Sequence, residues 1–392
     1  MRNIKFVFDK DIILNVCIMI EFILCFFISF FTMLGESSYV SFMFTLTFIV
    51  LILTFFYVLF KEKLEIIDAQ NLLILLTIIV FGIISILIVS KVISFNYLKK
   101  YFMFLSTLIF LYIITKTYIK MYTLNFILLI NFLLIFLYYF FYHFGNTAYV
   151  KGGLALNFSN PNLLSLWLLH SLLYSIISFF YTSTKIIKLF SIIGILILIP
   201  LILQTKTRSV FLALVIFIIL FFYSLFQKNK FNKILTIILL LYPLIFSILY
   251  LYSINIPHIL ELFDFVSTPG KGLDSRLSTW LFAFNVIKNS KLFGNYFLIS
   301  FGTGRSQLHN THIDTMASYG CFVFLLFIIY LYRIIYPITA SCKGITQKIA
   351  LSSFFAIIIM GSGEAAFVSG SVGMYLLSCS YLLFARNTNK LK

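Results

Sequence analysis

Long apolar segments alternate with short polar connections along almost the whole chain. Segments of about 20 apolar residues match a bilayer hydrocarbon core of roughly 30 Å. No period-two alternation is present, so helices rather than barrel strands are predicted to satisfy the backbone in lipid. The pattern predicts a single all-α membrane domain over residues 1–392 with about twelve spans. Their ranges are 12–34, 39–60, 72–90, 101–115, 123–143, 163–182, 186–204, 209–226, 234–254, 313–335, 347–361 and 368–385.

One polar segment, residues 255–312, interrupts this pattern between the ninth and tenth spans. A membrane protein needs only short turns to link its helices, so a segment this long predicts a function of its own. Asp274-Ser275-Arg276 is a helix-start signal, and Gly294-Asn295 is a helix breaker. Between them, Leu277, Leu281 and Phe284 share one helical face. We therefore expect an amphipathic helix on the outer membrane surface, forming part of a site.

The composition supports an integral membrane protein, since hydrophobic residues make up 62%, charged residues 10%, and mean hydropathy is +1.07. The distribution of Lys and Arg predicts the orientation. The even-numbered connections and both tails hold 18 of the 29 basic residues, which predicts that both termini are cytoplasmic. Lys91, Lys99 and Lys100 go against this rule on the predicted outer side.

The arginines point to an anionic partner. Of the six in the chain, Arg208, Arg276 and Arg305 fall on the predicted outer side, together with Lys206. Arginine grips phosphate or carboxylate with a rigid two-pronged fork, which a lysine does not. Helix capping and contact with lipid headgroups are the alternatives for each arginine taken singly. Two acidic residues also stand out, Glu21 in the middle of the first span and Glu364, with roles that stay open.

Several short motifs follow one another in a fixed order over residues 204–324. They are Gln204-Thr-Lys206-Thr-Arg208-Ser209, Ser275-Arg276-Leu-Ser-Thr-Trp280, Lys291-Leu-Phe-Gly294, Gly302-Thr-Gly304, His309-Asn310 and Gly320. In this order and spacing the chain resembles the O-antigen polymerase and ligase superfamily of bacterial surface polysaccharide assembly. The usual proline before Leu292 is absent, and Val323 stands where the ligase signature prefers Gly, Thr or Tyr. The second departure favours a repeat-unit polymerase over a ligase.

The resemblance implies a fold similar to the GT-C glycosyltransferases, with the site on the extracytoplasmic side of the bacterial inner membrane. It implies metal-independent glycosyl transfer from an undecaprenyl-diphosphate-linked oligosaccharide in O-antigen or capsule synthesis, without a cofactor. Membrane lipids, a chain-length regulator and a flippase of the same pathway are the expected partners, and nucleic acid is not. An O-antigen ligase and a lipid-linked oligosaccharide flippase or other transporter remain alternatives. A transporter should place its charges near the bilayer midplane.

The site residues follow from this reading. A sugar hydroxyl needs a general base near neutral pH, and His309 is the candidate. Arg208 and Arg276 are expected to stabilise the diphosphate leaving group. The remaining expected contacts with substrate come from Arg305, Asn310, Lys206, His312 and Trp280. Two alternatives stay open for His309: a helix cap without catalytic role, and a metal site shared with His312 and Asp314.

Overall fold

The computed structural model describes residues 10–61, 66–89, 95–116, 119–145, 148–150, 152–158, 160–226, 233–253, 274–295, 308–363 and 374–387. Of these residues 88% are helical, which confirms the all-α fold class. Nine helices in the described part are long and apolar enough to cross a membrane, as expected of a polytopic membrane protein. They are α1 (Lys10–Leu34), α2 (Ser37–Lys61), α3 (Ile66–Ile84), α5 (Met121–Phe144), α6 (Pro161–Tyr181), α7 (Lys185–Thr205), α8 (Arg208–Phe226), α9 (Lys233–Ser253) and α14 (Cys321–Ser341).

Shorter or more polar elements complete the fold. Helices α4 (Phe95–Lys116), α15 (Ile345–Met360) and α16 (Met374–Asn387) occupy three further predicted spans, and the total of twelve spans stays a prediction. A π-helical turn, η1 (Ser85–Val89), extends α3, while α11 (Asp274–Asn289) and α13 (Thr311–Tyr319) precede α14. Strands β1 (Tyr149–Val150) and β2 (Gly153–Leu154) form a small antiparallel hairpin with Tyr149 opposite Leu154.

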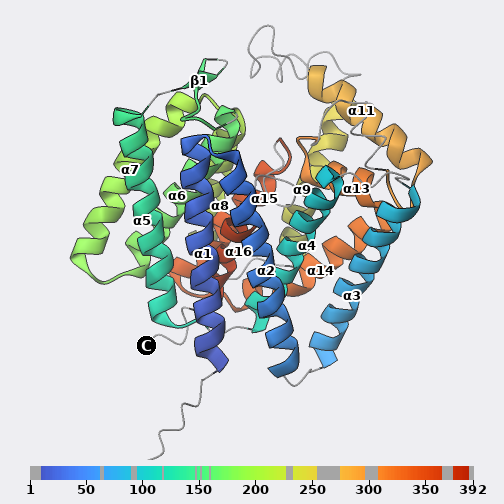
Figure 1. The fold of residues 1–392 in the computed structure, drawn as a ribbon, viewed down its shortest axis with the longest axis horizontal. Coiled ribbons are helices and arrows are strands. Elements are labelled where there is room, and N and C mark those ends of the chain that lie inside the picture. Colours follow the sequence, from blue (N-terminus) through green and yellow to red (C-terminus); the bar gives the residue numbers. More distant parts are fainter. Residues whose placement is uncertain are drawn as a thin grey trace, which may run out of the picture.

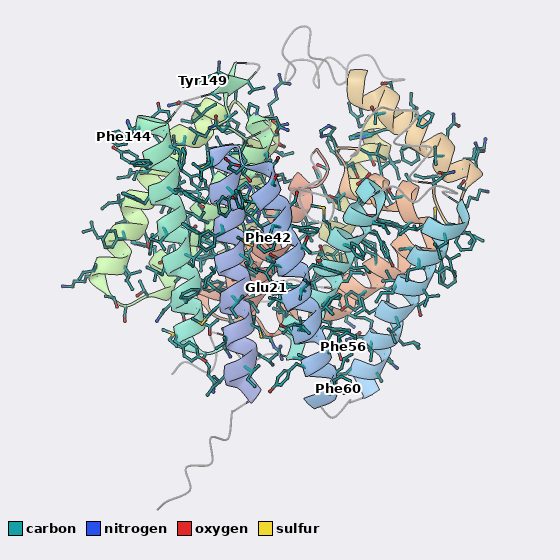
Figure 2. The ribbon with its side chains drawn as sticks, viewed as in Figure 1. Glu21, Phe42, Phe56, Phe60, Phe144 and Tyr149 are labelled. Carbon is teal, nitrogen blue, oxygen red and sulfur yellow. The ribbon has the colours of Figure 1, made fainter. Side chains whose placement is uncertain are left out.

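The centre of the bundle is formed by helices that are buried on every side. All residues of α15 from Ile349 to Met360 are buried, and α6 and α16 pack against it. The outer helices instead carry exposed apolar side chains, including Phe42, Phe60 and Phe144, which point away from the bundle (Figure 2). An exposed apolar belt of this kind is what helices facing lipid require.

The start of α1 and the end of α16 lie at one end of the bundle, which we call the terminal end. There the Lys120 N–H donates to Asn15 Oδ1 near the start of α1 at 2.9 Å. The Gln347 side chain donates to the Ala385 carbonyl, so α15 starts where α16 ends. Lys116 at the end of α4 pairs with Asp68 near the start of α3. The basic clusters predicted to be cytoplasmic therefore lie together at the terminal end, as far as the structure describes them. That this end faces the cytoplasm stays a prediction.

The opposite end, which we call the loop end, carries the β hairpin and α11 (Figure 1). The hairpin packs closely on the connection between α7 and α8, since a Cβ on Gly153 would lie 2.5 Å from the Thr205 carbonyl oxygen. The loop after the hairpin reaches the end of α1, where the Asn157 amide donates to the Met33 carbonyl at 2.8 Å. The loop end thus gathers the starts of α6, α8 and α13.

The predicted continuous span at 313–335 is wrong, because Gly320 divides it into α13 and α14. Gly320 has φ 94° and ψ 162°, a conformation that is essentially confined to glycine. The break is filled by a turn from α11, where the Lys291 carbonyl accepts from the Cys321 N–H at 2.8 Å. The Asn295 N–H donates to the Ala317 carbonyl at 2.7 Å. The Lys291-Leu-Phe-Gly294 motif therefore serves to hold the interrupted span.

Helix α11 also packs differently from the face predicted for it. Its buried hydrophobic side chains are Trp280, Ala283 and Val286, which contact α9 and α13 in a second small hydrophobic cluster. Leu281, expected on the apolar face, is 52% exposed. The predicted face assumed a helix resting on lipid, whereas the observed face is set by the helices beneath it.

Candidate active site

The connection between α7 and α8 presents two basic residues at the loop end. Lys206 ends α7 in a left-handed conformation with φ 54°, and Arg208 is the first residue of α8; both are exposed. The turn is fixed by the Thr207 hydroxyl, which donates to Asn162 Oδ1 at the start of α6 at 3.2 Å. The first turn of a long helix carries unpaired N–H groups and a partial positive charge. This arrangement suits an anion.

A second part of the loop end is the start of α13, which Asn310 caps. Its Oδ1 accepts from the N–H groups of His312 and Ile313 at 3.0 Å. Its amide donates to the carbonyl of Pro243 in α9 at 2.8 Å and to that of Ser362 after α15 at 3.3 Å. Asn310 is fully buried, so its side chain ties α13 to two neighbouring helices. Its predicted contact with substrate stays a prediction.

His309 directly precedes this cap and is partly exposed. Its backbone is left-handed, with φ 53°. A non-glycine residue in this region costs on the order of 1–3 kcal/mol, and such residues cluster at functional sites. Four described non-glycine residues have positive φ, and all four lie at the loop end: Leu156, Asn157, Lys206 and His309. Two of them were predicted as site residues from the sequence alone.

His312 is buried, and its ring is held against α9. Its Nε2 donates to the carbonyl of Leu240 in α9 at 2.6 Å. Asp314, the other residue of the metal alternative, pairs instead with Lys100 at 2.7 Å. Within the described residues there is no group of three His, Cys, Asp or Glu able to hold a metal ion.

Helix α11 joins the same end through Trp280. The Trp280 indole N–H donates to the carbonyl of Leu308, next to His309, at 2.8 Å. Its ring meets Tyr250 edge-on, with centroids 5.7 Å apart. Trp280 is fully buried and so fixes α11 against the start of α13. Arg276 lies one turn earlier, in the first turn of α11. Arg305 lies outside the described residues.

Helix α15 links the start of α8 to the start of α13. Lys348, near the beginning of α15, donates to the carbonyl of Ser224, near the end of α8. The two helices therefore pack antiparallel, and the end of α15 lies beside the start of α8. At that end the Gly361 carbonyl accepts from the Thr311 N–H at 2.9 Å. The structure thus brings Arg208, the first turn of α11 and His309 to one end of the bundle.

Three residues that help to build this site were missed from the sequence. Asn162, in the first turn of α6, accepts from Thr207 and so orients the Lys206–Arg208 turn. Pro243 cannot continue the backbone ladder of α9 in the regular way, and its own carbonyl anchors Asn310. Lys100 was noted only as an exception to the orientation rule. Two features of the sequence could have indicated these roles: Pro243 interrupts an apolar span, and Lys100 places a charge at the edge of another.

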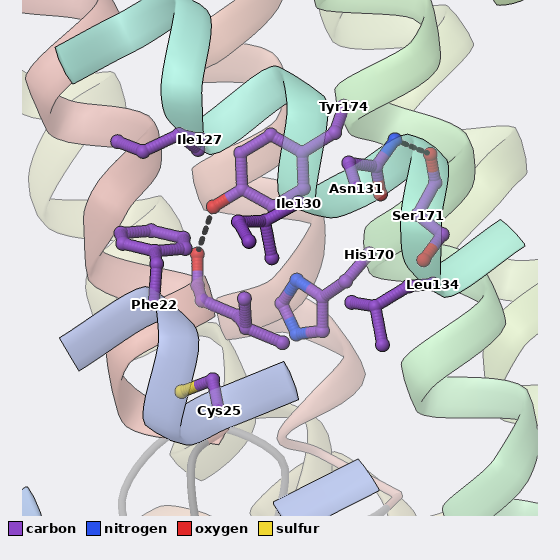
Figure 3. Close-up of a pocket in the computed structure, with 10 residues that line it drawn as sticks. Phe22, Cys25, Ile127, Ile130, Asn131, Leu134, His170, Ser171 and Tyr174 are labelled. Atoms are coloured by element: carbon purple, nitrogen blue, oxygen red, sulfur yellow. Dashed lines mark hydrogen bonds between the residues drawn. The ribbon is translucent and has the colours of Figure 1, made fainter. Parts of the chain in front are cut away.

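A small internal cavity lies elsewhere, between α1, α5, α6 and α16 (Figure 3). Its volume is about 10 Å³, measured as the space open to the centre of a water molecule, which fits roughly one water. Asn131 and His170 line it. Glu21 lies about halfway along α1 (Figure 2), and its carboxylate has no hydrogen-bond partner among the described residues. The cavity is too small for a sugar. Glu364 lies outside the described residues.

No protein-family model, no curated protein and no solved structure matches this chain. The family resemblance therefore rests on the ordered sequence motifs.

Proposed function

We propose that this chain is a glycosyltransferase that polymerises undecaprenyl-diphosphate-linked oligosaccharide repeat units at the outer face of the bacterial inner membrane. The observation that carries the proposal is that α15 and Trp280 link three motif-bearing segments toward the loop end. Residues 208, 276 and 309 are far apart in the sequence, and α15 and Trp280 bring the segments that carry them together.

The basic groups supply what a diphosphate leaving group needs. Negative charge grows on the diphosphate as the glycosyl bond breaks, and fixed positive groups stabilise that charge. Arg208 combines a guanidinium with the positive end of α8, and Lys206 lies in the turn before it. Arg276 lies in the first turn of a second helix, α11, at the same end. Arg305 belongs to the same loop and is proposed to bind the second phosphate or the sugar.

His309 supplies the second requirement, a base for the attacking sugar hydroxyl. It is partly exposed and held in a left-handed backbone conformation immediately before a helix whose cap is fully buried. This combination presents an imidazole on a rigid support, as proton transfer in a defined direction requires. His312 is turned toward α9 instead, so the single-base role falls to His309.

A deletion strain distinguishes this proposal from the ligase and transporter alternatives. A polymerase deletion leaves a single repeat unit attached to the acceptor, whereas a ligase deletion removes attachment altogether. Loss of a transporter leaves repeat units on the carrier at the cytoplasmic face. A glycan ladder that keeps its full length in the deletion strain would exclude the polymerase function.

The arginine role has a sharper test in Arg208→Lys, because lysine keeps the charge and loses the fork. We expect its rate of polymerisation to fall by about 10²–10³-fold, the usual effect of removing a donor to a developing charge. Lys288→Arg is a suitable control, since it changes one basic type into the other in the last turn of α11. Normal polymerisation by Arg208→Lys would contradict two-pronged binding of the diphosphate.

A further inference from the structure

A buried ion pair fastens the interrupted tenth span to α4. Lys100 Nζ lies 2.7 Å from Asp314 Oδ1, and the two side chains are 8% and 1% exposed. The same ammonium donates to the hydroxyl of Ser318 at 3.3 Å. Asp314 and Ser318 are four residues apart, so they lie on one face of α13. One lysine therefore holds two successive turns of this short helix.

The location of Lys100 explains an exception in the charge pattern. Lys116, at the other end of α4, lies at the terminal end, so Lys100 lies toward the loop end. There it goes against the distribution of basic residues that predicts the orientation. Its partner Asp314 comes from a segment 214 residues away. A specific structural contact, rather than membrane topology, accounts for a positive charge at this position.

A gain in folding stability does not by itself explain why Lys100 and Asp314 are paired. Removing two charges from water is costly, and buried ion pairs are often no more stabilising than apolar residues of similar size. What such a pair supplies is a defined position, because a charge buried away from its partner would be strongly destabilising. Helix α13 needs this, since its nine residues are too few to be stable as an isolated helix.

Helix α13 is fixed at three points along its length. Asn310 and His312 attach its start to α9 and α15. Lys100 holds its middle from α4. The turn at Lys291–Asn295 holds its end, and the Ser85 hydroxyl in η1 donates to the Ser318 carbonyl at 3.3 Å. Of these contacts only the one with Lys100 joins two full charges.

We propose that Lys100 is a positioning residue whose ion pair with Asp314 sets the place of α13, and through it the place of His309, in the active site. The statement about His309 rests on the proposed function. The statement about α13 does not, because it concerns the structure of the helix itself.

The test replaces both charges together, so that neither is left buried alone. The double variant Lys100→Met with Asp314→Leu keeps apolar volume at both positions. We expect it to be recovered folded at wild-type yield. Hydrogen–deuterium exchange of the 311–319 amides should be faster by about tenfold or more, because α13 opens locally. The matched control is Lys116→Met with Asp68→Leu, which removes the ion pair at the other end of α4 and should leave these amides unchanged.

Activity gives the second readout, with lipid-diphosphate-linked repeat units as the substrate of the purified protein. In the Lys100–Asp314 double variant we expect kcat to fall by about tenfold to 10²-fold, since small displacements of a catalytic group are costly. KM should change by less than about twofold, because the arginines are untouched. Should this double variant not fold, Lys100→Arg keeps the charge and shifts the anchoring atoms, and the same faster exchange of 311–319 is expected.

The two readouts separate the possible failures. Wild-type exchange at 311–319 in the double variant, or in Lys100→Arg if it is used, would overturn the positioning role. Faster exchange with unchanged kcat would show that α13 is positioned by Lys100 but that the reaction does not depend on it. If the purified wild-type protein shows no glycosyl transfer, the proposed function is contradicted. The exchange rates at 311–319 then still test whether Lys100 positions α13.

Discussion

Replacing Gly320 with alanine should disrupt the junction of α13 and α14 more than an ordinary glycine substitution. A Cβ at this position would lie 1.9 Å from the Leu292 carbonyl oxygen, so the turn from α11 has to move. That movement breaks two backbone hydrogen bonds, from Cys321 to Lys291 and from Asn295 to Ala317. Strain at positive φ adds about 1–3 kcal/mol and the bonds about 0.5–1.5 kcal/mol each, for a total of about 2–6 kcal/mol.

Gly35 provides the matched control. It also has a positive φ, 80°, in the connection between α1 and α2, but a Cβ there would meet nothing within 4 Å. Gly35→Ala should therefore cost only the strain, about 1–3 kcal/mol. Both free energies of unfolding can be measured in mixed micelles with a rising fraction of denaturing detergent. If Gly320→Ala lowers the free energy of unfolding no more than Gly35→Ala does, the close packing of Leu292 on Gly320 does not stabilise the fold.

A further prediction concerns the cap of α13. Asn310→Ala should cost about 2–4 kcal/mol, since it removes the cap and two hydrogen bonds to neighbouring helices. Asn160→Ala is the control, because it removes only the cap of α6 and should cost about 1 kcal/mol. Equal losses in the free energy of unfolding would refute the bridging role of Asn310.

The membrane helices were predictable because they depend on local sequence. The apolar run 186–204, flanked by Lys185 and Lys206, agrees within a residue with α7. The break at Gly320 was not predictable in the same way. Gly194 also lies inside an apolar run, and α7 continues through it without interruption. What distinguishes Gly320 is the approach of the Leu292 carbonyl, a contact that no local pattern contains.

The candidate site shows the same division between local and distant information. The His309-Asn310 motif and the exposed Arg208 could be identified because residue type and order mark them. The Asn310 side chain points into the bundle because its amide donates to the carbonyls of Pro243 and Ser362. These carbonyls are far from Asn310 in the sequence, so the sequence alone does not reveal the contact. The role of Lys100 depends on a partner in another part of the chain. The sequence therefore indicated candidate residues, and the fold determined that Asn310 and His312 bind neighbouring helices.

The central claim is that His309 acts as the base in glycosyl transfer at the loop end. The direct measurement is the initial rate of polymer formation by purified protein in lipid vesicles, supplied with polyprenyl-diphosphate-linked repeat units. His143→Ala serves as the control, because His143 is an exposed histidine at the same end, on the last turn of α5. The account predicts a loss of about 10²–10⁴-fold for His309→Ala and a wild-type rate for His143→Ala. Wild-type polymer formation by His309→Ala would contradict it.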